Sequence, residues 1–139
     1  MNQIGFRMYN KYMLNRHEVR EKIVFALYQH LLLNKNINEC FDNNFEENGY
    51  DEFSLNIKND LNNNINDYIY QIGEHLVKWT FDRLNLVEQA ILLEAVSEIN
   101  LNINEKAIII DEAVILTKKY CDEEAYKYIN GVLDNICNN

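Results

Sequence analysis

The sequence predicts an all-α protein built as one compact domain. Apolar residues recur at a spacing of about 3.6 residues in almost every segment, which places them on one face of a helix. No segment shows the sustained alternation of apolar and polar residues that marks a half-buried strand. At 139 residues the chain has the length of a single domain, and no internal repeat or linker divides it.

The first predicted helix starts after Asn15. The Asn15 side chain can accept a hydrogen bond from the amide of Glu18 while Glu18 reaches back, which is the pattern of a capping box. One apolar stripe follows, and it consists of Val19, Ile23, Ala26, Leu27, His30 and Leu31. We interpret the histidine on this stripe as a core residue. The polar residues 34–38 end the helix.

The next part of the chain predicts three helices of unequal clarity. A short one is indicated by Cys40, Phe41 and Phe45, and residues 49–51 form a joint after it. A second short helix is indicated by Phe53, Leu55, Ile57 and Leu61. The third has a much cleaner stripe, which consists of Ile65, Tyr68, Ile69, Ile72, Leu76 and Trp79.

Three further helices complete the prediction. Asn85 is a second capping candidate with Glu88 three residues on, and the helix that it starts extends to about residue 99. Another helix begins near Ala107 and continues to Tyr120 at helical spacing, despite three consecutive isoleucines that favour a strand locally. The last helix carries the stripe Ile129, Val132, Leu133 and Ile136. We expect Gly131 within it to allow a neighbouring helix to approach closely.

The charge is strongly acidic but unevenly distributed. A net charge of −9 excludes a protein whose whole surface attracts nucleic acid. Residues 1–22 carry five basic and two acidic residues, a net +3, whereas the remaining chain carries eight basic and twenty acidic residues, a net −12. A basic end on an acidic body is the asymmetry expected of a local contact with a polyanion, although a solvated terminus would have the same composition.

No catalytic constellation is visible. An enzyme needs a nucleophile, a base or a metal held in mutual reach, but His17, His30 and His75 are scattered along the chain. The only serines, Ser54 and Ser97, lie in no nucleophile-elbow context, and the four glycines form no phosphate-binding loop. The sequence therefore predicts a protein that is not an enzyme and that needs no cofactor.

The cysteines and the absence of apolar runs indicate a reducing compartment. Cys40, Cys121 and Cys137 are odd in number and far apart, without a CxxC pair, so we predict free thiols and no metal site. No secretory signal begins the chain, and no run approaches the roughly 20 apolar residues that span a bilayer. We expect a cytoplasmic protein.

Four segments, in this order and at this spacing, resemble the NusB family of bacterial transcription antitermination factors. They are residues 26–29 (ALYQ), 79–85 (WTFDRLN), 87–92 (VEQAIL) and 110–134, which starts with IDEA and ends with YINGVLD. The resemblance covers roughly residues 16–136. It implies about seven helices in two small bundles packed across one another, with residues 15–139 as the NusB-like domain. Residues 1–14 exceed the family pattern, and we expect them to form a disordered basic arm.

The resemblance also implies RNA binding. NusB-like proteins pair with NusE, a small ribosomal subunit protein, and the pair binds boxA, a single-stranded element of nascent ribosomal RNA, before other Nus factors join RNA polymerase. Six positions of this chain match RNA-contacting positions of the family: Arg16, His17, Arg20, Glu124, Lys127 and Tyr128. A lysine can neutralise a phosphate and an exposed tyrosine can stack on an unpaired base. By spacing alone, however, Tyr128 would belong to the core.

For NusE, the matching positions are Tyr28 and Glu88. A tyrosine offers apolar area with a hydroxyl, and a carboxylate can pair with a basic ribosomal protein. For Glu88 the capping role competes with this one. The family's arginine cluster is thinned here, because His17 and Glu18 stand where basic residues are common. The alternative function is therefore an acidic helical interaction module that binds NusE but has lost significant RNA affinity.

Overall fold

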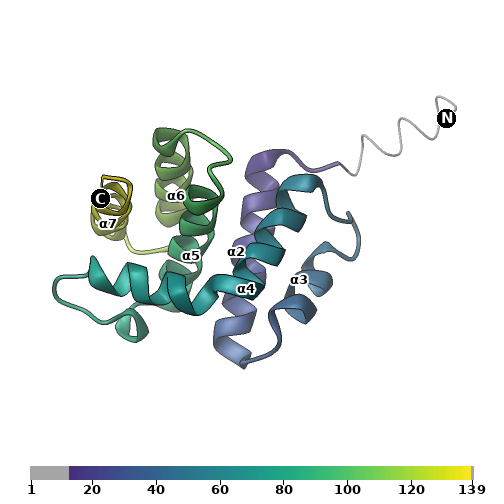
Figure 1. The fold of residues 1–139 in the computed structure, drawn as a ribbon, viewed down its shortest axis with the longest axis horizontal. Coiled ribbons are helices and arrows are strands. Elements are labelled where there is room, and N and C mark those ends of the chain that lie inside the picture. Colours follow the sequence, from purple (N-terminus) through teal and green to yellow (C-terminus); the bar gives the residue numbers. More distant parts are fainter. Residues whose placement is uncertain (1–12, 139) are drawn as a thin grey trace, which may run out of the picture.

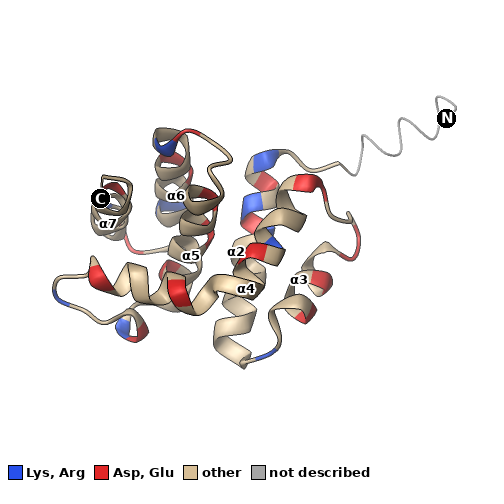
Figure 2. Ribbon diagram, in the orientation of Figure 1, with Lys and Arg blue, Asp and Glu red and all other residues tan. Residues whose placement is uncertain are grey.

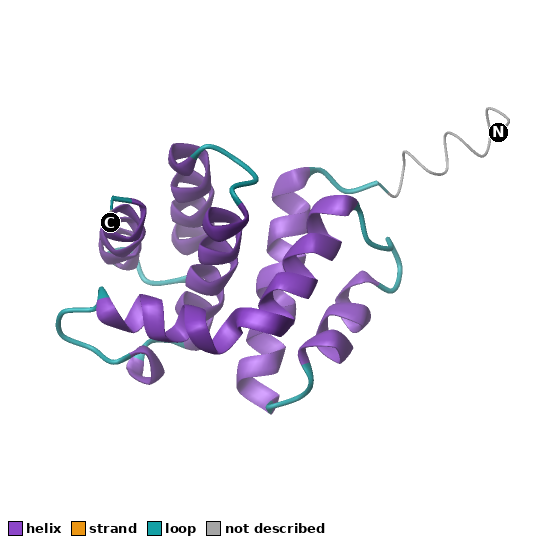
Figure 3. Cartoon of the chain, viewed as in Figure 1, coloured by secondary structure: helices purple, strands orange, loops and turns teal. Residues whose placement is uncertain are grey.

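The computed structural model describes residues 13–138. Within them the chain forms six α-helices and one short 3-10 helix, and no strand (Figure 3). The helices are α2 (Arg16–Leu33), α3 (Ile37–Phe45), α4 (Glu52–Glu74), η1 (Phe81–Arg83), α5 (Leu86–Leu101), α6 (Lys106–Tyr120) and α7 (Ala125–Cys137). The all-α prediction is confirmed. Of the arm expected over residues 1–14, residues 1–12 lie outside the described part, and Leu14 packs against the core.

The helices form two groups that meet along α5. One group contains α2, α3 and the first part of α4, and the other contains α5, α6 and α7 (Figure 1). Helix α5 packs against α2, α4, α6 and α7. It is therefore buried around most of its circumference, which explains why buried residues, most of them apolar, occur on every side of this helix.

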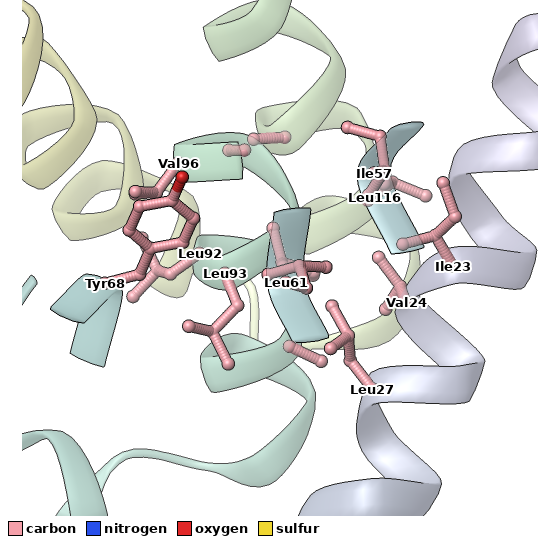
Figure 4. Close-up of a cluster of buried hydrophobic side chains, with 14 of the residues drawn as sticks. Ile23, Val24, Leu27, Ile57, Leu61, Tyr68, Leu92, Leu93, Val96 and Leu116 are labelled. Atoms are coloured by element: carbon pink, nitrogen blue, oxygen red, sulfur yellow. The ribbon is translucent and has the colours of Figure 1, made fainter. Parts of the chain in front are cut away.

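The core lies where α2, α4 and α5 cross. Figure 4 shows side chains of these three helices and of α6 pointing toward one another, among them Ile23, Leu27, Ile57, Leu61, Leu92, Leu93 and Leu116. Each of these seven side chains is at most 1% exposed. Burying an apolar side chain of this size contributes about 1.5 to 3 kcal/mol. The predicted stripes of the first and last helices are buried as expected, apart from the half-buried His30 and Leu31.

Helix α4 corrects the predicted helix count. The two segments expected around residues 53–61 and 65–79 form one continuous helix, and the tract Asn62 to Asn64 lies inside it. The apolar face on both sides of this tract packs against α5, and this tertiary contact outweighs the weak helix propensity of asparagine. Trp79, expected at the end of the stripe, lies beyond the helix and is exposed, and Leu55 is exposed as well.

Asparagine caps helices at both ends in this proline-free chain. Three asparagines accept hydrogen bonds from backbone amides at helix starts, and two take the left-handed conformation at helix ends: Asn15, Asn36, Asn85, Asn34 and Asn102. The predicted capping box of α2 is confirmed, with Asn15 accepting from the Glu18 amide at 2.8 Å. Asn85 caps α5 through the Val87 amide. The reciprocal bond expected from Glu88 is not formed, because its carboxylate accepts from Tyr128 instead.

Gly131 does not mediate close helix packing. A Cβ atom built on it would meet no heavy atom within 4 Å, so the expected close approach of a neighbouring helix is wrong. The glycine instead lies at the edge of a surface hollow between α7 and the segment after α4. Open space, rather than a neighbouring backbone, surrounds this position.

Candidate nucleic-acid interface

Arg16 is the most accessible cation of the predicted RNA-binding set on α2. It is the first residue of the helix and is exposed. Its guanidinium carbon lies 4.0 Å from the centroid of the Phe53 ring, so α4 supports the side chain through a cation–π contact. The contact restricts the arginine side chain and leaves the guanidinium open to a solvent-borne phosphate.

His17 faces carboxylates. Its Nδ1 lies 3.0 Å from a Glu112 carboxylate oxygen on α6, and its Nε2 lies 3.7 Å from Glu21 one turn along α2. The imidazole is therefore held in the seam between α2 and α6. In this geometry it links two helices, and it is poorly placed to meet a polyanion.

Arg20 does not reach the surface. Its side chain is 3% exposed, and it donates two hydrogen bonds to the Glu98 carboxylate of α5, from Nε at 2.8 Å and from a terminal nitrogen at 2.9 Å. This bidentate pair fixes α2 against α5. Arg20 therefore does not share an exposed surface with Arg16, because the stripe that buries Ile23 and Leu27 also carries Arg20 inward.

A second carboxyl group joins this buried pair. Glu94, one turn before Glu98 on α5, is 2% exposed, and its Oε2 has no hydrogen-bond partner within the described residues. Burial raises the pKa of Glu94 well above its ordinary value, and the neighbouring Glu98 raises it further. The pKa of Glu98 is lowered: burial acts to raise it, but the hydrogen bonds from Arg20 and Glu94 outweigh that effect. One guanidinium thus faces two carboxyl groups, of which Glu94 has the raised pKa and Glu98 the lowered one.

The first turn of α7 presents a lysine to solvent. Lys127 is exposed, and its Nζ lies 2.6 Å from the Glu124 carboxylate, three residues earlier. An exposed ion pair of this kind contributes only about 0 to 1 kcal/mol. Glu124 therefore reduces the positive charge at Lys127, but this weak pair leaves the lysine able to bind a stronger anionic partner.

Tyr128 and Glu88, predicted for two different partners, contact each other. The Tyr128 hydroxyl donates a hydrogen bond to the Glu88 carboxylate across the start of α5 and α7. Burial and this carboxylate both raise the pKa of Tyr128, so the hydroxyl remains a donor. The ring is half-buried and lies beside the hollow edged by Gly131. The Tyr128 ring is thus neither a fully buried core residue nor a free surface ring.

Tyr28 lies on an exposed apolar strip of α2. It is half-buried, with Phe25 one turn before it and Leu32 one turn after it, and both of these side chains are exposed. The strip continues onto α6, because the Phe25 and Tyr120 rings meet edge to face with centroids 5.6 Å apart. Residues of this size exposed in a row indicate a surface that a partner covers.

Arg16 and Lys127, two members of the predicted RNA-binding set, lie toward opposite ends of the contact between α2 and α6. Glu21 of α2 accepts hydrogen bonds from Lys119 and Tyr120 at the end of α6, and Lys127 follows in the first turn of α7. Arg16 precedes Glu21 by five residues, about 7.5 Å along the helix axis. Elsewhere acidic residues are spread over most helices (Figure 2). The accessible cations of this set, Arg16 and Lys127, therefore stand singly on an acidic body, and exposed carboxylates precede Lys127 in the sequence.

The sequence prediction missed Trp79. Its place on a helical stripe favoured burial, yet 60% of the residue is exposed in the segment that connects α4 to η1. The signal that could have identified it is the run of bulky and basic residues from Val77 to Trp79 after the last buried position, Ile72.

Three other features bear on the kind of site: the cysteines, possible metal ligands and possible membrane-spanning helices. All three cysteines are free, as predicted, and burial raises the pKa of Cys121 to about 11, which keeps it a thiol. Residues 13–138 hold no group of three histidine, cysteine or acidic side chains placed to share a metal ion. None of their helices is both long enough and apolar enough to cross a bilayer.

Comparisons with known proteins agree on one family. The model of the NusB family matches residues 17–138. A transcription antitermination protein NusB of Sulfurimonas denitrificans is 38% identical over 128 residues, covering 89% of this chain and 97% of that protein. The counterpart in Campylobacter lari is also 38% identical, over 89% of this chain and 96% of its own length.

Solved structures give the same result. A NusB structure from T. maritima superposes with a TM-score of 0.82 at 25% identity, covering 90% of this chain and 92% of that one. A second structure, of antitermination factors NusB and NusE in complex with double-stranded RNA, superposes with a TM-score of 0.78 at 28% identity, covering 92% and 97%.

Proposed function

We propose, since the chain belongs to the NusB family, that it is an RNA-binding transcription antitermination factor. It pairs with NusE and binds boxA-type single-stranded RNA in nascent ribosomal RNA transcripts. Other Nus factors and RNA polymerase are then indirect partners, and the protein acts in the cytoplasm without catalysing a reaction. The observation that carries this proposal is the match over residues 17–138 together with an exposed lysine and a half-buried tyrosine in the first turn of α7.

We assign the six predicted RNA positions to two roles, according to their exposure and contacts. Arg16, Lys127 and Tyr128 are accessible enough to touch RNA, and Glu124 moderates Lys127. His17 and Arg20 act as positioning residues, because they hold α2 against α6 and α5. Few phosphate contacts imply modest intrinsic affinity, so NusE binding has to precede stable RNA binding.

Removing an accessible cation should weaken RNA binding and reduce its salt dependence. For Lys127→Ala in the presence of NusE, we expect the log–log slope of affinity against salt to become shallower by about 0.7, the value for one phosphate contact on a single strand. Arg16→Ala should give a similar change. Fluorescence anisotropy of labelled boxA RNA at several salt concentrations measures it.

Lys35→Ala is the matched control for these variants. Lys35 is an exposed lysine in the connection between α2 and α3, at the other end of α2 from Arg16. The control should keep the wild-type slope. Equal slopes for wild type, Arg16→Ala and Lys127→Ala would remove the proposed RNA contacts.

The apolar strip of α2 supports the NusE contact. Tyr28→Ala should weaken NusE binding by about 1 to 3 kcal/mol if the ring is a central contact, because truncating such an aromatic residue leaves a poorly filled interface. Isothermal titration calorimetry of the purified pair measures the change. Tyr70→Ala, which removes an exposed tyrosine from α4, is the control. Unchanged affinity for Tyr28→Ala would place the interface elsewhere.

A second function is favoured by one observation, the burial of Arg20 against Glu98. Because Arg20 is buried and Lys127 is paired with Glu124, the second function is that of an acidic module that binds NusE without useful RNA affinity. The discriminating result is a NusE complex whose RNA affinity does not exceed that of NusE alone and depends weakly on salt.

A further inference from the structure

A hollow of about 330 Å³ lies between α7 and the segment that follows α4. Lys78 and Trp79 form one wall, and Tyr128, Gly131 and Asn135 contribute the other. The Trp79 residue is 60% exposed, which is unusual for so large an apolar group on a monomer. The absence of a Cβ atom at Gly131 keeps the α7 side open.

The chemistry of the walls suits an unpaired nucleobase. Indole and phenol rings offer flat surfaces on which any base can stack. The Asn135 side-chain amide both donates and accepts hydrogen bonds, as the edge of a base requires. Lys78 supplies a positive charge for the phosphate that accompanies the base. Aromatic, amide and cationic groups together are the set that single-stranded RNA needs.

The charge of the hollow distinguishes it from the rest of the surface. None of the residues that line it is acidic, although the protein carries a net charge of −9. A second hollow of similar size, near Tyr50, has Glu47 and Asp51 in its wall, and these carboxylates would repel a phosphate. The connection after α4, residues 75–80, carries one lysine, Lys78, and no acidic residue. Of the two hollows, only the one beside Trp79 therefore favours an anionic strand.

The hollow is also continuous with the proposed RNA contact. Tyr128 contributes to its wall, and Lys127, the exposed lysine in the first turn of α7, is the adjacent residue. We infer that this hollow binds one unpaired base of the RNA strand whose backbone Lys127 and Lys78 contact. The inference rests on the proposed function and adds Trp79, Lys78 and Asn135 to its contacts.

Trp79 is the only tryptophan of the chain, so its fluorescence reports on this hollow directly. The experiment titrates single-stranded boxA RNA into the complex with NusE while tryptophan emission and anisotropy of a labelled RNA are followed in parallel. The NusE used is a variant free of tryptophan. Base stacking on the indole should quench the emission with the same midpoint as the anisotropy change.

A variant that fills the hollow tests the proposed base pocket without changing the aromatic residues. Gly131→Leu places a side chain in the hollow and should weaken RNA binding by about 5- to 150-fold, the contribution of one stacked base. Gly73→Leu is the matched control, because Gly73 is also helical with open space at its Cβ position and does not line the hollow. Circular dichroism checks that both variants fold.

The outcomes separate this inference from the proposed function. RNA binding by anisotropy without a change in Trp79 emission, or with equal affinity for the two leucine variants, would overturn the base pocket and leave the proposed function standing. Quenching by NusE alone, with no further change on adding RNA, would mean that a protein covers the hollow. Absence of RNA binding to the NusE complex would overturn both.

Discussion

Replacing Arg20 with methionine is expected to destabilise the fold by about 3 to 5 kcal/mol. The substitution keeps an unbranched apolar stem but leaves the Glu98 carboxylate buried without its bidentate donor. The desolvation cost of an unpaired buried charge dominates, because the lost packing is small. For a domain of this size the loss is a large fraction of the total stability. Urea denaturation followed by circular dichroism measures it.

Two further variants make this prediction specific. Arg16→Met removes the neighbouring exposed arginine and its contact with Phe53, and should cost no more than about 1 kcal/mol. The double variant Arg20→Met/Glu98→Met removes both charges and should recover most of the stability lost in Arg20→Met. If Arg16→Met and Arg20→Met were equally destabilising, the buried pair would not be the anchor of α2 on α5.

Glu94→Gln is expected to stabilise the protein at neutral pH and to flatten its dependence on pH. The pKa of Glu94 is raised in the folded state by burial and by Glu98. Above the unfolded pKa of this carboxyl group, folding is therefore coupled to proton uptake by Glu94. The stability that the protonated acid contributes is complete below its unfolded pKa of about 4.5 and is lost as the pH rises toward the folded value.

The loss amounts to about 1.4 kcal/mol for each pH unit over which Glu94 stays protonated in the folded protein and ionised in the unfolded chain. Glutamine has the same shape, can donate to Glu98 as the acid does, and takes up no proton. The gain of Glu94→Gln over wild type should thus grow from about pH 4.5 upward and disappear below it.

Glu98 gives the opposite dependence and provides an internal reference. Its pKa is lowered in the folded state by Arg20 and Glu94, so its contribution is present above its ordinary pKa and is lost as the pH falls through the lowered value. Both wild type and Glu94→Gln should show this acid-side loss. Urea denaturation at a series of pH values measures both the loss of stability at low pH and the loss at higher pH. A constant difference between the two proteins from pH 4 to pH 8 would show that Glu94 is ionised in both states.

Most of the helical framework could be predicted from local pattern. Stripes such as those of α2 and α7 and the Asn15 cap depend on residues within one helix, so spacing alone identifies them. The two predicted helices that merge into α4 show the limit of this reasoning. A polar tract such as residues 62–64 is compatible with a break or with a continuous helix, and packing against α5 decides.

The candidate site was less predictable because its charges depend on contacts across the fold. Family resemblance identified Lys127, Tyr128 and Tyr28, and all three remain at least partly accessible. It did not indicate that Arg20 is buried, although Arg20 lies three residues before Ile23 and shares its stripe. Trp79 illustrates the reverse error, since a helical spacing that continues past the end of α4 placed it in the core.

Sequence by itself determined that this protein is helical, acidic and similar to one family, because helical spacing, composition and motif order are properties of the chain alone. Tertiary structure decided which charges are available for binding. Whether an arginine meets phosphate or carboxylate depends on which helix packs over it, and only the crossing of α2 on α5 places Glu98 opposite Arg20 and leaves Arg16 in solvent. The electrostatic energy of each group is set by that burial, which no local spacing fixes.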